Sequence, residues 1–314
     1  MESFLASGSP VPALSAAALS KRYGDRVAVD ALSFTVESGQ LCALLGPNGA
    51  GKTTTMRMLV GLSRPDSGVA TVLGEPVALG AGVLRRAGVV IDGPALVPHL
   101  TGRANLKLLW TATRRAWPPP ALSEALDLAG LGGTLDRRVK GYSMGMKQRL
   151  ILAQALMRRP DVLILDEPTN GLDPAEVRAL REHLVDLAAR GASVLVSSHQ
   201  LAEVQQTATH VVVMNLGRLV AAGPIGDMVG GAGSYRLGVD DALNATAVLG
   251  NHPGVVRATV QGDEIAVHAP GVPSRDLVRA LVTAGIGVTT VREEGTSLED
   301  AFLTLTQGDD HAAR

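Results

Sequence analysis

Short apolar runs alternate along much of the chain with segments whose apolar residues recur at helical spacing. Continuous apolar runs are typical of strands buried on both faces, as in a parallel sheet. Such runs occupy residues 41–45, 162–166, 193–197 and 211–214. A helix is predicted at 175–189, with one apolar face formed by Val177, Leu180, Leu184 and Leu187. Strands that alternate with helices predict an α/β fold, in which ligands bind beyond the carboxyl ends of parallel strands.

Two regions depart from this alternation within the first part of the chain. Residues 14–36 carry short apolar runs between turns, which predicts small antiparallel strands, and a further strand is predicted at 69–73. Residues 93–159 have helical patterns at 104–113 and 122–129, broken by prolines 118–120 and by glycines near 130–133. We therefore expect a helical insert between the strands of the parallel sheet.

A glycine cluster at 230–233 marks a predicted domain boundary. The pattern beyond it predicts strand, helix, strand, strand, helix, strand and a last helix at 298–305, which together form a small α+β module. The predicted organisation is thus a disordered lead-in at 1–13, a main domain at 14–230 and an accessory domain at 231–314.

Composition narrows the class of protein. The chain has 314 residues, 46% of them apolar, and its 29 basic residues nearly balance 30 acidic ones. This balance gives no electrostatic case for a nucleic-acid partner. The only cysteine, Cys42, lies in an apolar run, so no disulfide can form within the chain, which suits the cytosol. No secretory signal begins the sequence, and no apolar run reaches the ~18 residues that span a bilayer.

A glycine-rich loop follows the apolar run 41–45 and precedes a predicted helix. Glycines allow such a loop to turn its N–H groups toward a phosphate, and the helix N-terminus adds a positive dipole end. Lys52 is predicted to reach the β- and γ-phosphates, and Thr53 to hold Mg²⁺. The predicted nucleotide-binding residues are Gly46, Pro47, Asn48, Gly49, Ala50, Gly51, Lys52, Thr53 and Thr54.

Acidic and imidazole side chains follow two other predicted strands. Asp166 ends the run 162–166, where its carboxylate can hold Mg²⁺ through water, and the adjacent Glu167 can act as general base. His199 follows the strand at 193–197 and would emerge at the same sheet edge, where it can orient a water. The competing interpretations are a solvated acidic turn and a structural histidine.

Two further positions attract attention on local grounds. Ser143 is a plausible N-cap, and with Gly145 it opens a helix whose free N–H groups could receive an anion. A simple helix start is the alternative. Tyr23 stands in a predicted turn, where an ordinary half-buried aromatic is the alternative to a binding role.

Together these residues resemble the nucleotide-binding subunit of an ABC transporter, over residues 14–223. Gly46 to Thr53 is similar to the Walker A loop, and 162–167 to Walker B. The resemblance implies a P-loop NTPase fold with a RecA-like core, an antiparallel β subdomain and a helical subdomain. It also implies further roles: adenine stacking for Tyr23, a D-loop at Asp173, a switch histidine at His199, and a family signature at Ser143, Met144, Gly145 and Met146 that acts on the opposite protomer.

Two positions differ from the usual family pattern. Met144 and Met146 replace the third and fifth residues of the signature, whereas Ser143 and Gly145 are kept. Asp92 stands where the Q-loop glutamine is usual, and it remains able to accept a water from Mg²⁺. The predicted metal-site residues are Thr53, Asp92 and Asp166. With a C-terminal Ser-Leu-Glu-Asp-Ala-Phe-Leu segment, these features resemble exporters of the bacitracin- and daunorubicin-resistance type.

The resemblance implies an ATPase that uses ATP and Mg²⁺, pairs with an identical or related ATPase subunit, and serves a separate integral membrane permease. We expect it on the cytoplasmic face of the cell membrane, held there through the permease, without a nucleic-acid partner. The alternative is a soluble ABC ATPase that acts on ribosomes or DNA, although the two-domain chains and long coiled coils of those relatives are absent. A regulatory module that holds ATP without hydrolysis is disfavoured by Lys52, Asp166, Glu167 and His199.

Overall fold

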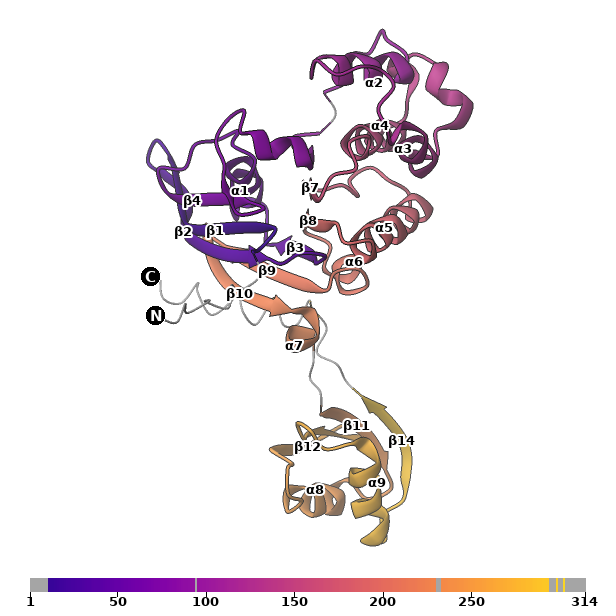
Figure 1. Ribbon diagram of the computed structural model, residues 1–314. Coiled ribbons are helices and arrows are strands. Elements are labelled where there is room, and N and C mark those ends of the chain that lie inside the picture. The colour runs from indigo at the N-terminus through magenta and orange to yellow at the C-terminus, as the bar shows by residue number, and fades with distance from the viewer. Residues whose placement is uncertain (1–10, 94, 230–232, 294–297, 299–301, 303–314) are drawn as a thin grey trace, which may run out of the picture. The chain divides into compact units, whose positions relative to one another are not determined.

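A computed structural model describes residues 11–93, 95–229, 233–293, 298 and 302 (Figure 1). The chain divides into two compact units, Met1–Ala222 and Gly223–Arg314. This division falls ahead of the glycine cluster at which the sequence suggests a boundary, and residues 230–232 of that cluster lie outside the described residues. Most of the predicted lead-in also lies outside them, whereas Ala13 is fully buried.

A six-stranded sheet forms the centre of the first unit, in the order β10-β9-β3-β8-β7-β6. Strands β9, β3, β8, β7 and β6 are parallel neighbours. Their apolar runs are buried on both faces, as the sequence predicts for a parallel sheet. The strands are β3 Leu41–Leu45, β6 Ala87–Val90, β7 Val162–Leu165, β8 Ser193–Ser198, β9 His210–Asn215 and β10 Arg218–Pro224.

A second, antiparallel sheet has the order β2-β1-β4-β5. Two long strands, β1 and β2, replace the several small ones predicted at 14–36, and they are joined by a turn through Gly24 at φ 57°. One hydrophobic core links this sheet to β3 and α1, for example through Leu32, Leu44 and Met56. The elements are β1 Leu14–Tyr23, β2 Arg26–Val36, β4 Ser67–Val72, β5 Glu75–Pro76 and α1 Lys52–Leu59.

Helices fill the segment between β6 and β7, as predicted (Figure 1). α3 coincides with the predicted 122–129 helix, whereas α2 begins two residues before the predicted 104–113 helix because the Thr101 side chain caps its N-terminus. The helices here are α2 Gly102–Thr111, α3 Leu122–Ala129, η2 Gly132–Asp136, η3 Val139–Gly141 and α4 Met144–Leu156, whereas the short η1 Gly82–Arg86 precedes β6. α5 Pro174–Ala189 follows β7, and α6 Leu201–Gln205 follows β8.

The second unit begins with the end of β10 and α7 Ile225–Val229, and then forms a four-stranded antiparallel sheet in the order β12-β13-β11-β14. After α7, the predicted order of strand, helix, strand, strand, helix and strand is confirmed: β11 Ser234–Val239, α8 Ala242–Gly250, β12 Arg257–Gln261, β13 Glu264–His268, α9 Ser274–Thr283 and β14 Val288–Glu293. Its core joins Leu237 and Ile265 of the sheet to Leu249 and Leu281 of the helices. Apart from positions 298 and 302, the predicted last helix lies outside the described residues.

Candidate nucleotide-binding site

The loop between β3 and α1 has a backbone that only glycine accommodates at several points. Gly51 lies at φ 104° directly before the first residue of α1, and Gly49 lies at φ 85°. A Cβ at Gly46 would lie 2.5 Å from the Met214 carbonyl oxygen of β9. The loop therefore packs tightly against the sheet, and α1 begins with free N–H groups at its N-terminus, where an anion is favoured.

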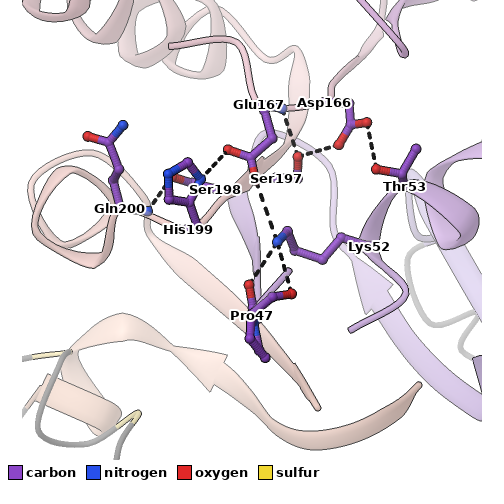
Figure 2. A network of polar contacts seen from close by, with 10 residues as sticks. Pro47, Lys52, Thr53, Asp166, Glu167, Ser197, Ser198, His199 and Gln200 are labelled. Carbon is purple, nitrogen blue, oxygen red and sulfur yellow. Dashed lines mark hydrogen bonds and ion pairs between the residues drawn. The ribbon is translucent and has the colours of Figure 1, made fainter. Parts of the chain in front are cut away.

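Lys52 lies across this loop with only 7% of its surface exposed. Its ammonium donates to the Gly46 carbonyl at 2.7 Å and to the Pro47 carbonyl at 3.5 Å, and it lies 3.5 Å from a Glu167 carboxylate oxygen (Figure 2). A buried ammonium needs such partners, because an unpaired charge in a protein interior is costly. Lys52 is thus held within the loop, where it can exchange these oxygens for those of a phosphate.

Thr53 and Asp166 meet although more than 100 residues separate them in the chain. The Thr53 hydroxyl donates to one Asp166 carboxylate oxygen at 2.8 Å, and Ser197 donates to the other at 2.6 Å (Figure 2). Both Thr53 and Asp166 offer hard oxygen atoms, the donors that Mg²⁺ prefers, and Mg²⁺ usually takes few protein ligands beside water and phosphate oxygens. The chemistry of this pair therefore fits Mg²⁺.

Glu167 is oriented by its backbone and by its neighbours together. Its φ of 46° lies in the left-handed region, which is uncommon outside glycine and found at functional sites. Its backbone N–H donates to the Ser197 hydroxyl at 2.8 Å, and its carboxylate lies 2.8 Å from Nδ1 of His199 (Figure 2). The structure thus brings the predicted base and the predicted switch histidine into hydrogen-bond contact beside Lys52.

Ser197 was not assigned a role from the sequence, yet it links Asp166 to Glu167. It is fully buried at the carboxyl end of β8, next to the strand that ends before Asp166. The available signal was its position: a serine in an otherwise apolar run, adjacent in the parallel sheet to the acidic pair. A buried hydroxyl needs hydrogen-bond partners, and here the partners are the two acidic residues.

Asp92 lies near the site but is paired with another side chain. Its carboxylate accepts from Arg57 of α1 at 2.5 and 3.0 Å, and this hydrogen bonding raises the pKa of Arg57. Among the described residues, no hydrogen bond joins Asp92 to Thr53 or Asp166. The predicted role of Asp92 at a metal stays a prediction.

Tyr23 lies at the end of β1 with 48% of its surface exposed. Its hydroxyl lies 3.3 Å from that of Ser63, and the Lys21 ammonium lies 5.6 Å from the ring centroid. An exposed ring with a hydroxyl contact can offer a face to a flat ligand. The role of Tyr23 in adenine stacking stays a prediction.

The signature segment lies in the helical part of the unit. Ser143 caps α4 by accepting from the Met146 N–H at 3.2 Å, and Met144 is 55% exposed. Asp173 caps α5 through a capping box with Glu176. In the described part of the chain no hydrogen bond or ion pair joins 143–146 to the 46–53 loop, and Figure 1 shows α4 grouped with α2 and α3, apart from α1.

The phosphate loop lies on a parallel sheet, beside the Thr53–Asp166 and Glu167–His199 pairs. This combination defines a P-loop nucleoside triphosphatase. A model of the ABC transporter family matches residues 29–170. The ABC transporter ATP-binding protein YhcH of Bacillus subtilis is 36% identical over 92% of this chain and 94% of its own length. The chain therefore belongs to the ABC transporter family as an ATP-binding subunit, and this membership implies ATP hydrolysis.

Other relatives and structures agree with this placement. The bacitracin transport ATP-binding protein BcrA of Bacillus licheniformis is 35% identical over 92% of this chain and 96% of its own length. A Nod factor export ATP-binding protein I of Paraburkholderia xenovorans is 44% identical over 65% of this chain and 68% of its own length. A solved ATP-binding subunit of an ABC transporter is similar with a TM-score of 0.63 and 32% identity, over 68% of this chain and 91% of its own. The expected ABC ATPase fold is thus confirmed.

Proposed function

We propose that this chain binds and hydrolyses Mg²⁺-ATP as one of a pair of ATPase subunits and thereby drives export of a drug, antibiotic, or peptide- or lipid-like compound through a separate membrane permease. The observation that carries the proposal is the contact of Glu167 with both Lys52 and His199 beside the phosphate loop. The name of the relative BcrA, which refers to bacitracin transport, supports the class of substrate.

In this proposal each contact at the loop has a chemical task. Lys52 binds the β- and γ-phosphates, and Thr53 and Asp166 hold Mg²⁺, which neutralises charge on the phosphates when it is bound. Glu167 accepts a proton from the attacking water, and His199 keeps the carboxylate and the water in position. Asp92 would accept a hydrogen bond from a water bound to that ion.

The second subunit completes the site in this proposal. Tyr23 stacks on the adenine, while Ser143 and Gly145 of the other subunit close over the γ-phosphate and Asp173 lies at the shared interface. The free N–H groups at the start of α4 support this assignment, because a helix N-terminus favours an anion. Loss of the γ-phosphate then allows the pair to open.

In this proposal the helical part of the chain contacts the permease. That contact holds the subunit on the cytoplasmic face of the membrane. None of the described helices is long and apolar enough to cross a bilayer.

The test is purification of the tagged chain from membranes in mild detergent, with identification of bound proteins and an ATPase assay. We expect a multi-spanning permease to be present, and Glu167→Gln to retain ATP in a dimer with hydrolysis reduced at least ~100-fold, within the range lost with a general base. Glu182→Gln, which makes the same change at an exposed position of α5, is the matched control. An active ATPase bound to ribosomes or DNA instead of a permease would refute the transport proposal.

A further inference from the structure

The sheet of the second unit has one covered face and one open face. Side chains of the covered face, such as Leu237 and Ile265, join the core that α8 and α9 complete. Because successive side chains of a strand point to opposite faces, Ala266 lies on the open face together with its register partners Thr259 and Arg236. A hollow of about 280 Å³ lies over β11, β12 and β13. The open-face residues that line it are Ser234, Arg257, Thr259, Gln261, Ala266 and His268.

Hydrogen-bonding groups surround this hollow, and Ala266 at its centre contributes only a methyl group. Arg257 of β12 and Ser234 of β11 are the register partners of His268 on either side of it, and such partners lie about 5 Å apart at Cβ. The Ser234 hydroxyl lies 3.1 Å from Nδ1 of His268. When that hydroxyl donates to Nδ1, the proton of a neutral imidazole is on Nε2, which is then a donor. A guanidinium, an imidazole and hydroxyl groups can therefore reach one ligand.

Positive charge on the open face exceeds what its carboxylate can neutralise. Arg236 lies 3.7 Å from Glu264, whereas in the described part of the chain no ion pair joins Arg257 or Arg292 to a carboxylate. Arg292 of β14 is moreover the register partner of Arg236. Like charges at opposite positions of a sheet are destabilising, so these arginines do not stabilise the sheet through their charge. A bound anion would offset this repulsion.

We propose that this hollow binds the phosphate group of a small phosphorylated molecule. A phosphate group offers three strong acceptor oxygens, enough for Arg257, His268 and the Ser234 hydroxyl at once, whereas the two oxygens of a carboxylate match a guanidinium alone. Thr259 and Gln261 can then form hydrogen bonds to polar groups on the rest of the molecule. The site belongs to the second unit and does not rest on the proposed ATPase function.

Two other sources of phosphate fit the open face less well. Nucleic-acid strands bind through aromatic side chains on which bases stack, and among the described residues of β11, β12, β13 and β14 no aromatic side chain lies on this face. Tyr235, which also lines the hollow, belongs to the covered face, and its hydroxyl donates to the Val272 carbonyl at 2.6 Å. A membrane surface is bound by apolar side chains beside the charges, whereas the side chains that line this face of the hollow are polar apart from Ala266.

The test is calorimetric titration of the full chain with glycerol 3-phosphate. ADP and Mg²⁺ in slight molar excess first occupy the loop at 46–53, so that the titration reports a second site. We expect binding with a Kd in the millimolar range or below. Arg257→Gln should weaken it at least ~10-fold, as expected for a lost charge-assisted contact. Arg257→Lys should lose less, because it keeps the charge without the planar fork.

Two further variants separate a shaped site from general surface charge. Ala266→Leu fills the hollow without a change of charge and should abolish binding. Arg275→Gln removes an exposed arginine from α9, against the covered face, and should bind as the wild type does. Circular dichroism and thermal unfolding show whether each variant is folded; if Ala266→Leu is not, Thr259→Leu at the neighbouring lining position replaces it.

Each contrary result overturns the inference. It fails if glycerol 3-phosphate does not bind, or if Arg257→Gln and the hollow-filling variant bind it as tightly as the wild type. Equal affinity for glycerate, which carries a carboxylate in place of the phosphate, would refute the assignment to phosphate. Binding to phosphatidylglycerol vesicles that depends on Arg257, without binding of glycerol 3-phosphate, would assign the face to a lipid. None of these measurements depends on ATP hydrolysis, so the proposed function stands or fails separately.

Discussion

The hydroxyl of Ser197 provides a direct test of how the site is held together. It accepts from the Glu167 N–H at 2.8 Å and donates to Asp166 at 2.6 Å, and no part of the residue is exposed. Ser197→Ala removes both contacts and leaves little space for a replacement water. The Glu167 N–H then loses its partner, whereas Asp166 keeps the Thr53 hydroxyl at 2.8 Å.

The expected cost follows from these partners. A buried donor left without an acceptor costs ~1–3 kcal/mol, so we expect Ser197→Ala to lower the free energy of unfolding by about 2 kcal/mol. For a unit of this size each 1 kcal/mol lowers the Tm by ~2–4 °C, which gives a decrease of about 4–8 °C. If Glu167 also loses its alignment with the attacking water, the activation free energy of ATP hydrolysis rises by ~1.4–2.7 kcal/mol, which lowers kcat about 10- to 100-fold.

A second serine on the same strand gives the matched control. Ser193 is 2% exposed and accepts from the Gly39 N–H at 3.0 Å, at the opposite end of β8 from the site. Ser193→Ala should lower the Tm to a similar extent and leave kcat unchanged. Thermal unfolding and steady-state ATP hydrolysis of both variants measure the two effects. Equal kcat values for Ser197→Ala and Ser193→Ala would refute the positioning role of Ser197.

Three other outcomes follow from the structure. Burial raises the pKa of the Cys42 thiol to about 12, so at pH 8 a thiol reagent should label Cys42 only after unfolding in guanidinium; labelling of the native chain would contradict this. Because this pKa is raised above its unfolded value of 9.0, the associated stability is present below pH 9 and is lost as the pH rises toward 12. Gly51→Ala places a Cβ against the Ala28 carbonyl at a positive φ, which should abolish binding of a fluorescent ATP analogue, whereas Gly82→Ala, with open space around it, should bind normally. The Arg57–Asp92 pair is 39% and 48% exposed, so Arg57→Gln should change the free energy of unfolding by less than ~1 kcal/mol; a larger loss in a denaturant titration would count against an exposed pair.

The sequence predicts elements well where one local signal dominates. Buried parallel strands such as 162–166 are continuous apolar runs, and the helix at 122–129 matches its prediction because the apolar spacing and Gly130 at its end agree. The N-terminal strands were predicted too short. Ala18 and Ala31, at φ 50° and 47°, interrupt the alternation of apolar and polar residues in these strands. The strands continue past both positions because they pair with each other in the sheet, which the local sequence does not show.

The site was predictable in its composition but less so in its contacts. The spacing of Gly46 to Thr53 predicts a phosphate loop, and the ends of two predicted strands place Asp166 and His199 at one sheet edge. Which groups hydrogen-bond there depends on strand order and register, which bring Ser197 beside the acidic pair. The pairing of Asp92 with Arg57 is likewise a tertiary contact between a strand end and α1 that no local pattern encodes.

The contacts of Lys52 show how the loop stabilises a buried charge that a phosphate can also bind. A buried ammonium and a neighbouring carboxylate each cost free energy when unpaired, and here Lys52 and Glu167 lie 3.5 Å apart. In the proposed mechanism a phosphate competes for Lys52, since it carries more charge than the loop carbonyls at 2.7 and 3.5 Å. Glu167 then loses its cationic neighbour but keeps His199 at 2.8 Å and the Ser197 contact that fixes its backbone. When Lys52 exchanges its protein partners for the phosphate, the Glu167 carboxylate therefore stays oriented and is free to accept a proton.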